Sequence, residues 1–129
     1  MLLDLVIVGG AGALGAVARY LSYVCGRVFF PGQFPWVTLV INVAGCLLIG
    51  SVMTLVERAV PYHRHVFLAG AVGFLGSFTT FSTFGFENLE LIQAGRPAWA
   101  ALNIGGQVAL GIAAVWLGRA MTHGLVGGP

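Results

Sequence analysis

The chain has 129 residues, of which 58% are hydrophobic and only 8% are charged, and its mean hydropathy is +0.94. A soluble domain carries about 25% charged residues, so this composition excludes a water-exposed surface and predicts an integral membrane protein in contact with lipid. The net charge is only +2, with six scattered arginines, no lysine and four acidic residues, which excludes the basic patch that a nucleic-acid partner would require.

Four apolar stretches are long enough to cross a bilayer, which takes about 20 residues in a helix. In chain order they cover approximately residues 3–28, 37–56, 66–92 and 98–117. The loops between them are short, so we expect one all-α transmembrane domain that spans residues 1–129.

The first span contains Arg19, the one cation well inside an apolar stretch. A charge at membrane depth is a functional hypothesis by default. The alternative is that its long side chain extends to the membrane surface beside the first loop, and the sequence leaves both interpretations open.

The second and fourth spans carry polar residues four positions apart. Thr38 and Asn42 share a face of the second span, and Asn103 and Gln107 share a face of the fourth. Buried amides and hydroxyls need partners, so we expect all four side chains to face inward. They could bond neighbouring helices or line a polar path, and the position of Asn42 near the centre of its span favours the path.

The third span contains the most unusual segment, the run GFLGSFTTFSTF over residues 73–84. Hydroxyls contribute little to lipid packing and β-branched residues weaken a helix slightly. Irregular backbone at membrane depth survives only when it is buried in protein or lines a wet cavity. The run therefore predicts a path or a site inside the membrane.

The phenylalanines of this run recur at helical spacing, which usually indicates packing. A phenyl ring also has a positive edge that can contact an anion, so Phe81 and Phe84 are candidates for an ion path. If the helix breaks near Gly76 to Thr80, freed carbonyls could hold a small cation and freed N–H groups could favour an anion.

The arginines give almost no preference for either membrane orientation. They divide evenly between the two sides when Arg19 is counted: Arg58, Arg64 and Arg119 on one, and Arg19, Arg27 and Arg96 on the other. One explanation is a single orientation that another feature decides. The other is dual topology, in which copies insert both ways and form an antiparallel homodimer.

At these residues the chain resembles the Fluc fluoride channels, also called the CrcB family. The resemblance covers the four spans, the run Gly-Phe-Leu-Gly-x-x-Thr-Thr-Phe-Ser-Thr-Phe, and the pattern Thr-Leu-x-x-Asn on the second span. It implies an antiparallel dual-topology homodimer in the bacterial plasma (inner) membrane, with a third helix broken at mid-membrane. It also implies two pores that pass fluoride passively out of the cytoplasm and give fluoride resistance.

The resemblance assigns roles to particular residues. Phe81 and Phe84 match the phenylalanines whose ring edges line the fluoride path, and Asn42 matches the pore asparagine. Gly76 and Thr79 match the break whose backbone carbonyls, from both subunits, hold a central structural Na⁺. The polar lining near this asparagine is matched by Thr38, Ser82 and Thr83. The first-span arginine of the family, which lies near an aqueous vestibule, is matched by Arg19.

Two departures from the family pattern affect these roles. Ser77 stands where many members have a second glycine, which leaves the backbone path at the break open. Asn103 and Gln107 stand where some relatives have Tyr and Ser, so their contact with the ion is an open question.

Two other classes of function are alternatives. A proton-coupled exporter of the small multidrug-resistance kind needs a carboxylate deep in the first span, where this chain has only Asp4 at the edge. A non-transporting subunit of a larger membrane assembly is the other. The sequence contains no ATP-binding motif, nucleophile–base pair or metal-ligand cluster, so we expect no enzyme activity.

Overall fold

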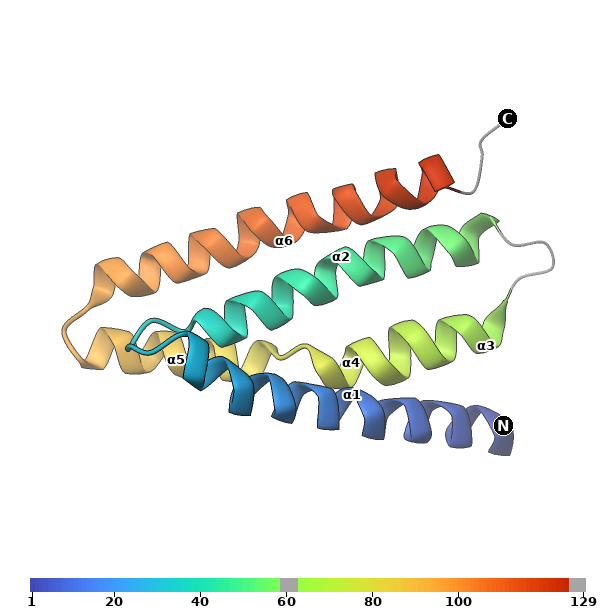
Figure 1. The fold of residues 1–129 in the computed structure, drawn as a ribbon, viewed down its shortest axis with the longest axis horizontal. Helices are drawn as coiled ribbons and strands as arrows, with labels where there is room; N and C mark the ends of the chain where they lie inside the picture. The colour runs from blue at the N-terminus through green and yellow to red at the C-terminus, as the bar shows by residue number, and fades with distance from the viewer. Residues whose placement is uncertain (59–62, 126–129) are drawn as a thin grey trace.

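The computed structural model describes residues 1–58 and 63–125, and this part of the chain is entirely helical apart from short connections. The elements are α1 (Leu2–Phe29), α2 (Trp36–Arg58), α3 (Arg64–Val66), η1 (Phe67–Leu75), α4 (Gly76–Phe78), α5 (Phe81–Gln93) and α6 (Pro97–Leu125). The elements α3, η1, α4 and α5 follow one another along a single line and together form the third long segment (Figure 1).

Four segments of the structure are long and apolar enough to cross a membrane: Leu2–Phe29, Trp36–Arg58, Arg64–Gln93 and Pro97–Leu125. This confirms the prediction of four long apolar helices suited to crossing a membrane. Three of them agree with the predicted ends to within about two residues, whereas α6 continues eight residues past the predicted end at residue 117. The continuation has a physical cause, because α6 keeps packing on α2 beyond that point.

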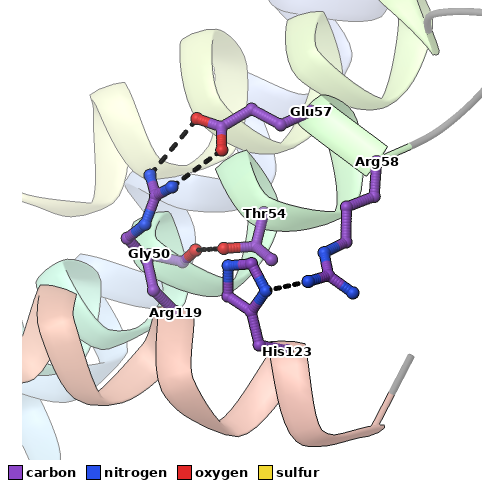
Figure 2. A network of polar contacts seen from close by, with 6 residues as sticks. All are labelled: Gly50, Thr54, Glu57, Arg58, Arg119 and His123. Carbon is purple, nitrogen blue, oxygen red and sulfur yellow. Dashed lines mark hydrogen bonds and ion pairs between the residues drawn. The ribbon is translucent and has the colours of Figure 1, made fainter. Parts of the chain in front are cut away.

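The contacts that extend this packing lie near the end of α2 (Figure 2). Arg119 donates two hydrogen bonds to the carboxylate of Glu57, at 3.2 and 2.8 Å. One turn further along, His123 contacts the guanidinium of Arg58. These polar pairs join the ends of the two helices in a region where the chain is no longer purely apolar.

The exposure pattern is the reverse of that in a soluble protein. Large apolar side chains cover the outside along the whole length of the helices. The buried side chains are divided evenly between apolar ones and polar ones, and the polar set is Thr38, Thr54, Thr80, Asn88, Asn103 and Thr122. An apolar outside with a hydrogen-bonded interior is the arrangement that a bilayer requires.

Glycines allow two helix pairs to pack backbone against backbone. Gly50 of α2 faces the backbone at Val115, and Gly118 of α6 faces the backbone at Leu47. In the other pair, Gly15 of α1 faces the backbone at Phe74 in η1. Close approach through small residues is a common basis of helix association in membranes, where the hydrophobic effect does not drive association between helices.

Two backbone features of the third segment depart from a regular α-helix. Phe67–Leu75 forms a π-helix, which the sequence did not predict. After Phe78 the helix stops, because Thr79 (φ −80°, ψ 161°) and Thr80 (φ −151°, ψ 113°) are extended, and it starts again at Phe81. The extended link is visible between α4 and α5 (Figure 1).

We predict that Gly118→Ala lowers the midpoint of thermal unfolding in detergent. The added methyl group must displace the backbone of α2 at Leu47, and overpacking of this kind costs about 1–3 kcal/mol. The matched control is Gly124→Ala on the same helix, where a methyl group would meet no atom within 4 Å. Equal midpoints for the two variants would contradict this packing.

Candidate functional site

A cavity of about 410 Å³ opens beside the extended link. Its walls come from α2, from the residues around the break and from α6, and its polar groups include Asn42, Thr79, Thr80 and Gln107. Phe81 and Phe84 line it as well. The structure therefore brings six of the predicted site residues to one space: Asn42, Gly76, Thr79, Phe81, Phe84 and Gln107.

Asn42 holds the extended link in place. Its Oδ1 accepts a hydrogen bond from the backbone N–H of Thr80 at 2.9 Å, and its Nδ2 donates to the carbonyl of the same residue at 3.2 Å. Nδ2 also donates to Oε1 of Gln107 at 2.7 Å. One amide on α2 thus supplies the acceptor that the Thr80 N–H loses at the break, and it adds a donor to the Thr80 carbonyl.

The break frees the carbonyls of residues 76–79 from their helical donors, and two of these four carbonyls are of interest here. In a continuous helix the N–H of Thr80 would bond the carbonyl of Gly76, and the N–H of Thr83 would bond that of Thr79. Here Thr80 donates to Asn42 instead, and Thr83 donates to Oγ1 of Thr80 at 3.2 Å. The carbonyls of Gly76 and Thr79 are the two that the sequence resemblance assigned to Na⁺.

Arg19 lies next to the break. Its Nη1 is 3.5 Å from the carbonyl oxygen of Thr79, and the side chain is half-buried between α1 and the third segment. Small residues let the neighbouring helices approach the break. Gly45 of α2 leaves room for the methyl group of Thr79. Ser77, which stands where many family members have a glycine, faces Gly12 of α1 and is half-buried.

The two phenylalanines of α5 differ in exposure. The centroids of the Phe81 and Phe84 rings are 5.5 Å apart, and their planes are tilted by 42°. The Phe84 side chain is half-buried, whereas Phe81 is 83% exposed in the single chain. A phenyl ring with that exposure has one side in the cavity and the other open to whatever surrounds the chain.

The hydroxyl of Thr80 caps the start of α5, and the hydroxyls of Ser82 and Thr83 contact it. Oγ1 of Thr80 is 3.3 Å from the Ser82 hydroxyl and 3.0 Å from that of Thr83. Together with the Thr83 N–H bond, this forms a side-chain cap at the first turn of the helix. Their hydroxyls therefore lie beside the cavity, bonded to Thr80, and neither residue is part of its wall.

Thr38 lies in a separate polar cluster closer to the first loop. It is fully buried, donates a hydrogen bond to Oε1 of Glu87 at 2.7 Å, and is 2.7 Å from the hydroxyl of Tyr23. A second cavity of about 250 Å³ is lined by Tyr23, Glu87 and Glu90, together with residues of the first loop. Thr38 therefore faces inward as predicted, but it bonds this cluster and does not line the cavity at the break.

The polar residues of α6 continue inward from Asn42. Gln107 donates to Oδ1 of Asn103 at 3.3 Å, and Asn103 donates to Oδ1 of Asn88 at 3.1 Å. Asn88 on α5 donates to the carbonyl of Phe84 at 2.7 Å. The sequence did not single out Asn88. The available signal was an amide in an apolar segment. Asn88 has no second polar residue three or four positions away, so the spacing that revealed the other polar pairs did not reveal it.

Comparisons with known proteins identify the family of this chain. Residues 6–119 match the family described as "CrcB-like protein, Camphor Resistance (CrcB)". The chain belongs to the CrcB-like family. This confirms the family that the sequence motifs suggested, and the match extends over all four membrane-spanning segments.

Relatives in the CrcB-like family are named "Fluoride-specific ion channel FluC". One from Nitratidesulfovibrio vulgaris is 45% identical over 115 residues, which cover 88% of this chain and 92% of the relative. Another from Hydrogenovibrio crunogenus is 44% identical over 118 residues, or 90% of this chain and 88% of the relative. A third, from Natronomonas pharaonis, is named "Fluoride-specific ion channel FluC 1" and is 43% identical over 113 residues, or 88% of each chain.

We predict that Asn42→Leu exposes the backbone of residues 79–83 to hydrogen exchange. The change leaves the Thr80 N–H without its acceptor, and one lost hydrogen bond of about 1.4 kcal/mol raises exchange about tenfold. Exchange followed by mass spectrometry on peptides that cover this segment measures the effect. The control is Ser22→Ala, which removes a hydroxyl bonded only within α1, and equal protection in both variants would contradict the role of Asn42.

Proposed function

We propose that this chain is a fluoride-selective channel that lets fluoride leave the cytoplasm passively. The observation that carries the proposal is the cavity at the break, where the amides of Asn42 and Gln107 meet the rings of Phe81 and Phe84. The names of the relatives agree with it, because proteins that are similar to this chain over nearly their whole length are called fluoride-specific ion channels.

The chemistry of the lining suits a small anion that must lose water. Amide N–H groups, hydroxyls and the positive edges of phenyl rings can replace hydration without placing a full charge in the path. Hydrogen fluoride crosses lipid as a neutral molecule and dissociates in a less acidic cytoplasm, which traps fluoride inside. A passive selective path then suffices to lower its concentration, and no coupled energy source is required.

We also propose that the break lies at the middle of the membrane. The third membrane-spanning segment runs from Arg64 to Gln93. The extended pair Thr79 and Thr80 is centred in it, with 15 residues before the pair (79 − 64) and 13 after it (93 − 80). Carbonyls and N–H groups exposed at that depth need protein, ion or water as partners.

A second copy of the chain completes the proposed channel. Phe81 is largely exposed and Gly76 is exposed as well, although both line the cavity. Gly9 and Gly10 of α1, with Gly105 of α6, meet no atom within 4 Å in the single chain, so these small-residue faces are free for another helix. The even division of arginines favours an antiparallel pair with two pores in the bacterial inner membrane.

Na⁺ fits the freed carbonyls of this proposed dimer. The carbonyl oxygens of Gly76 and Thr79 from the two copies would hold the ion, and hard cations prefer oxygen ligands of this kind. Arg19 also contacts the Thr79 oxygen, and a carbonyl oxygen has a second lone pair for another partner. The ion would supply a fixed charge that joins the two breaks and neutralises their partial negative charge.

The proton-coupled exporter lacks its central group in this arrangement. The carboxylate of α1 belongs to Asp4 in the first turn, and it forms an ion pair with Arg64 at 2.8 Å. It therefore lies at the end of the bundle and away from the cavity. The alternative of a non-transporting assembly subunit is decided by the flux experiment that follows.

We predict that liposomes containing the purified protein and loaded with fluoride release it when a potassium ionophore sets the membrane potential. Liposomes loaded with chloride should retain their chloride. A fluoride electrode measures the release. Equal chloride release would contradict selectivity, and absence of fluoride release would contradict the channel.

We predict in the same assay that Phe81→Ile slows fluoride release about tenfold, because it removes a ring edge worth about 1.4 kcal/mol to the anion in transit. Phe86→Ile is the matched control, since Phe86 lies on the same helix, is 60% exposed and does not line the cavity. If both variants match the unmodified protein, Phe81 is not part of the path.

We predict that replacing Na⁺ by a large organic cation at equal ionic strength lowers the thermal midpoint of the protein in detergent. An ion that binds only the folded dimer stabilises it by about 2.7 kcal/mol at one hundred times its dissociation constant. Identical midpoints in the two salts would contradict a structural Na⁺.

A further inference from the structure

The amides of Asn42, Gln107, Asn103 and Asn88 form one continuous ladder of side-chain hydrogen bonds. The ladder starts at the backbone of Thr80 beside the cavity and ends at the carbonyl of Phe84 in α5, with links of 2.7, 3.3, 3.1 and 2.7 Å. It connects α2, α6 and α5, so it joins three of the segments that surround the break.

The direction of every bond in the ladder is determined by its two ends. At one end the N–H of Thr80 can only donate, so the atom of Asn42 that it meets must be the oxygen. At the other end the carbonyl of Phe84 can only accept, so Asn88 must turn its nitrogen toward it. Asn88 then offers its oxygen to Asn103, Asn103 offers its oxygen to Gln107, and Gln107 offers its oxygen to Asn42.

Within the described part of the chain, this direction leaves one amide hydrogen unused on each of Gln107, Asn103 and Asn88, and of these three side chains only Gln107 lines the cavity. Both hydrogens of the Asn42 amide are used, one on Thr80 and one on Gln107. Gln107 has one bond from Nε2, to Asn103, among residues 1–58 and 63–125. Its second hydrogen remains, and its side chain lines the cavity.

We infer that Asn88 is a positioning residue for transport: through Asn103 it fixes the amide of Gln107 so that Gln107 turns an N–H into the cavity and supplies the direct donor to the anion. This inference rests on the proposed function. It assigns the donor role to Gln107 and leaves Asn42 the task of holding the break.

The burial of the ladder supports a fixed orientation. Asn103 has 0% exposure and Asn88 has 5%, so neither amide can exchange its partner for water. If Asn88 lost its oxygen, the buried N–H of Asn103 would have no acceptor, and Asn103 would gain by moving its amide toward another one. The oxygen of Asn103 would then leave Nε2 of Gln107, and the Gln107 amide would lose the contact that holds it in position.

The test is a double-mutant cycle in the liposome assay with Asn88→Leu and Gln107→Met. We expect Asn88→Leu to slow fluoride release about fivefold and Gln107→Met to slow it about tenfold, as expected for lost hydrogen bonds. The double variant should be no slower than Gln107→Met alone, because Asn88 acts through Gln107. Multiplication of the two effects, about 50-fold, would show that Asn88 supports only the fold and would overturn the inference.

A second readout does not depend on transport. The chain has three glutamines, Gln33, Gln93 and Gln107, so labelling glutamine with ¹⁵N gives three pairs of side-chain amide resonances. Asn88→Leu should shift the Gln107 pair and leave the other two unchanged, and fluoride should shift the Gln107 pair of the unmodified protein. An unmoved Gln107 pair in a protein that does release fluoride would overturn the inference.

Controls separate this inference from the proposed function. Gln93→Leu removes an amide that lies on α5, the helix of Asn88, but outside the ladder. We expect this variant to release fluoride at the unmodified rate. Asn103→Ala interrupts the ladder at its next step and replaces Asn88→Leu if that variant does not fold. If the unmodified protein releases no fluoride, the proposed function fails, and the resonances of the variants still decide whether Asn88 orients Gln107.

Discussion

The arrangement at the centre of this protein depends on one side chain, Asn42, which gives the Thr80 N–H a new acceptor where the helix breaks. A backbone N–H or carbonyl left without a partner in an apolar surrounding costs several kcal/mol. Asn42 accepts the hydrogen bond of the Thr80 N–H, so the third segment can open at Thr79 and Thr80 without that cost for this group. The opening in turn frees the carbonyls of Gly76 and Thr79 and creates the wall of the cavity.

The same constraint explains why the interior is so polar. Each amide that supports the break needs its own partner, and the requirement passes from Asn42 through Gln107 and Asn103 to Asn88, where a backbone carbonyl ends it. The apolar residues lie outside, where lipid replaces the packing of a soluble core. Glycines such as Gly50 and Gly118 bring α2 and α6 close enough for side chains as short as asparagine to reach across.

The single chain nevertheless does not enclose the cavity completely. Phe81 has most of its ring uncovered although it lines the cavity, and Gly76 is exposed beside it. The family to which the chain belongs and the names of its relatives agree with a channel for fluoride. The proposed second copy, related by an antiparallel arrangement, would cover these surfaces and bring two sets of freed carbonyls together around Na⁺.

The sequence by itself determined the membrane class, the four helical segments and the family, because apolar length and a rare motif are local properties of the chain. It also indicated Phe81 and Phe84 through their place in that motif, and Asn42 through its position near the centre of the second span. The π-helix of η1, the length of α6 and the position of Asn88 were decided by tertiary structure. Each of these depends on a neighbour distant in sequence: α1 packed on η1, Glu57 paired with Arg119, and Asn103 placed opposite Asn88. Spacing along one helix carries no information about such partners, since the direction of a hydrogen bond between helices depends on both of its ends.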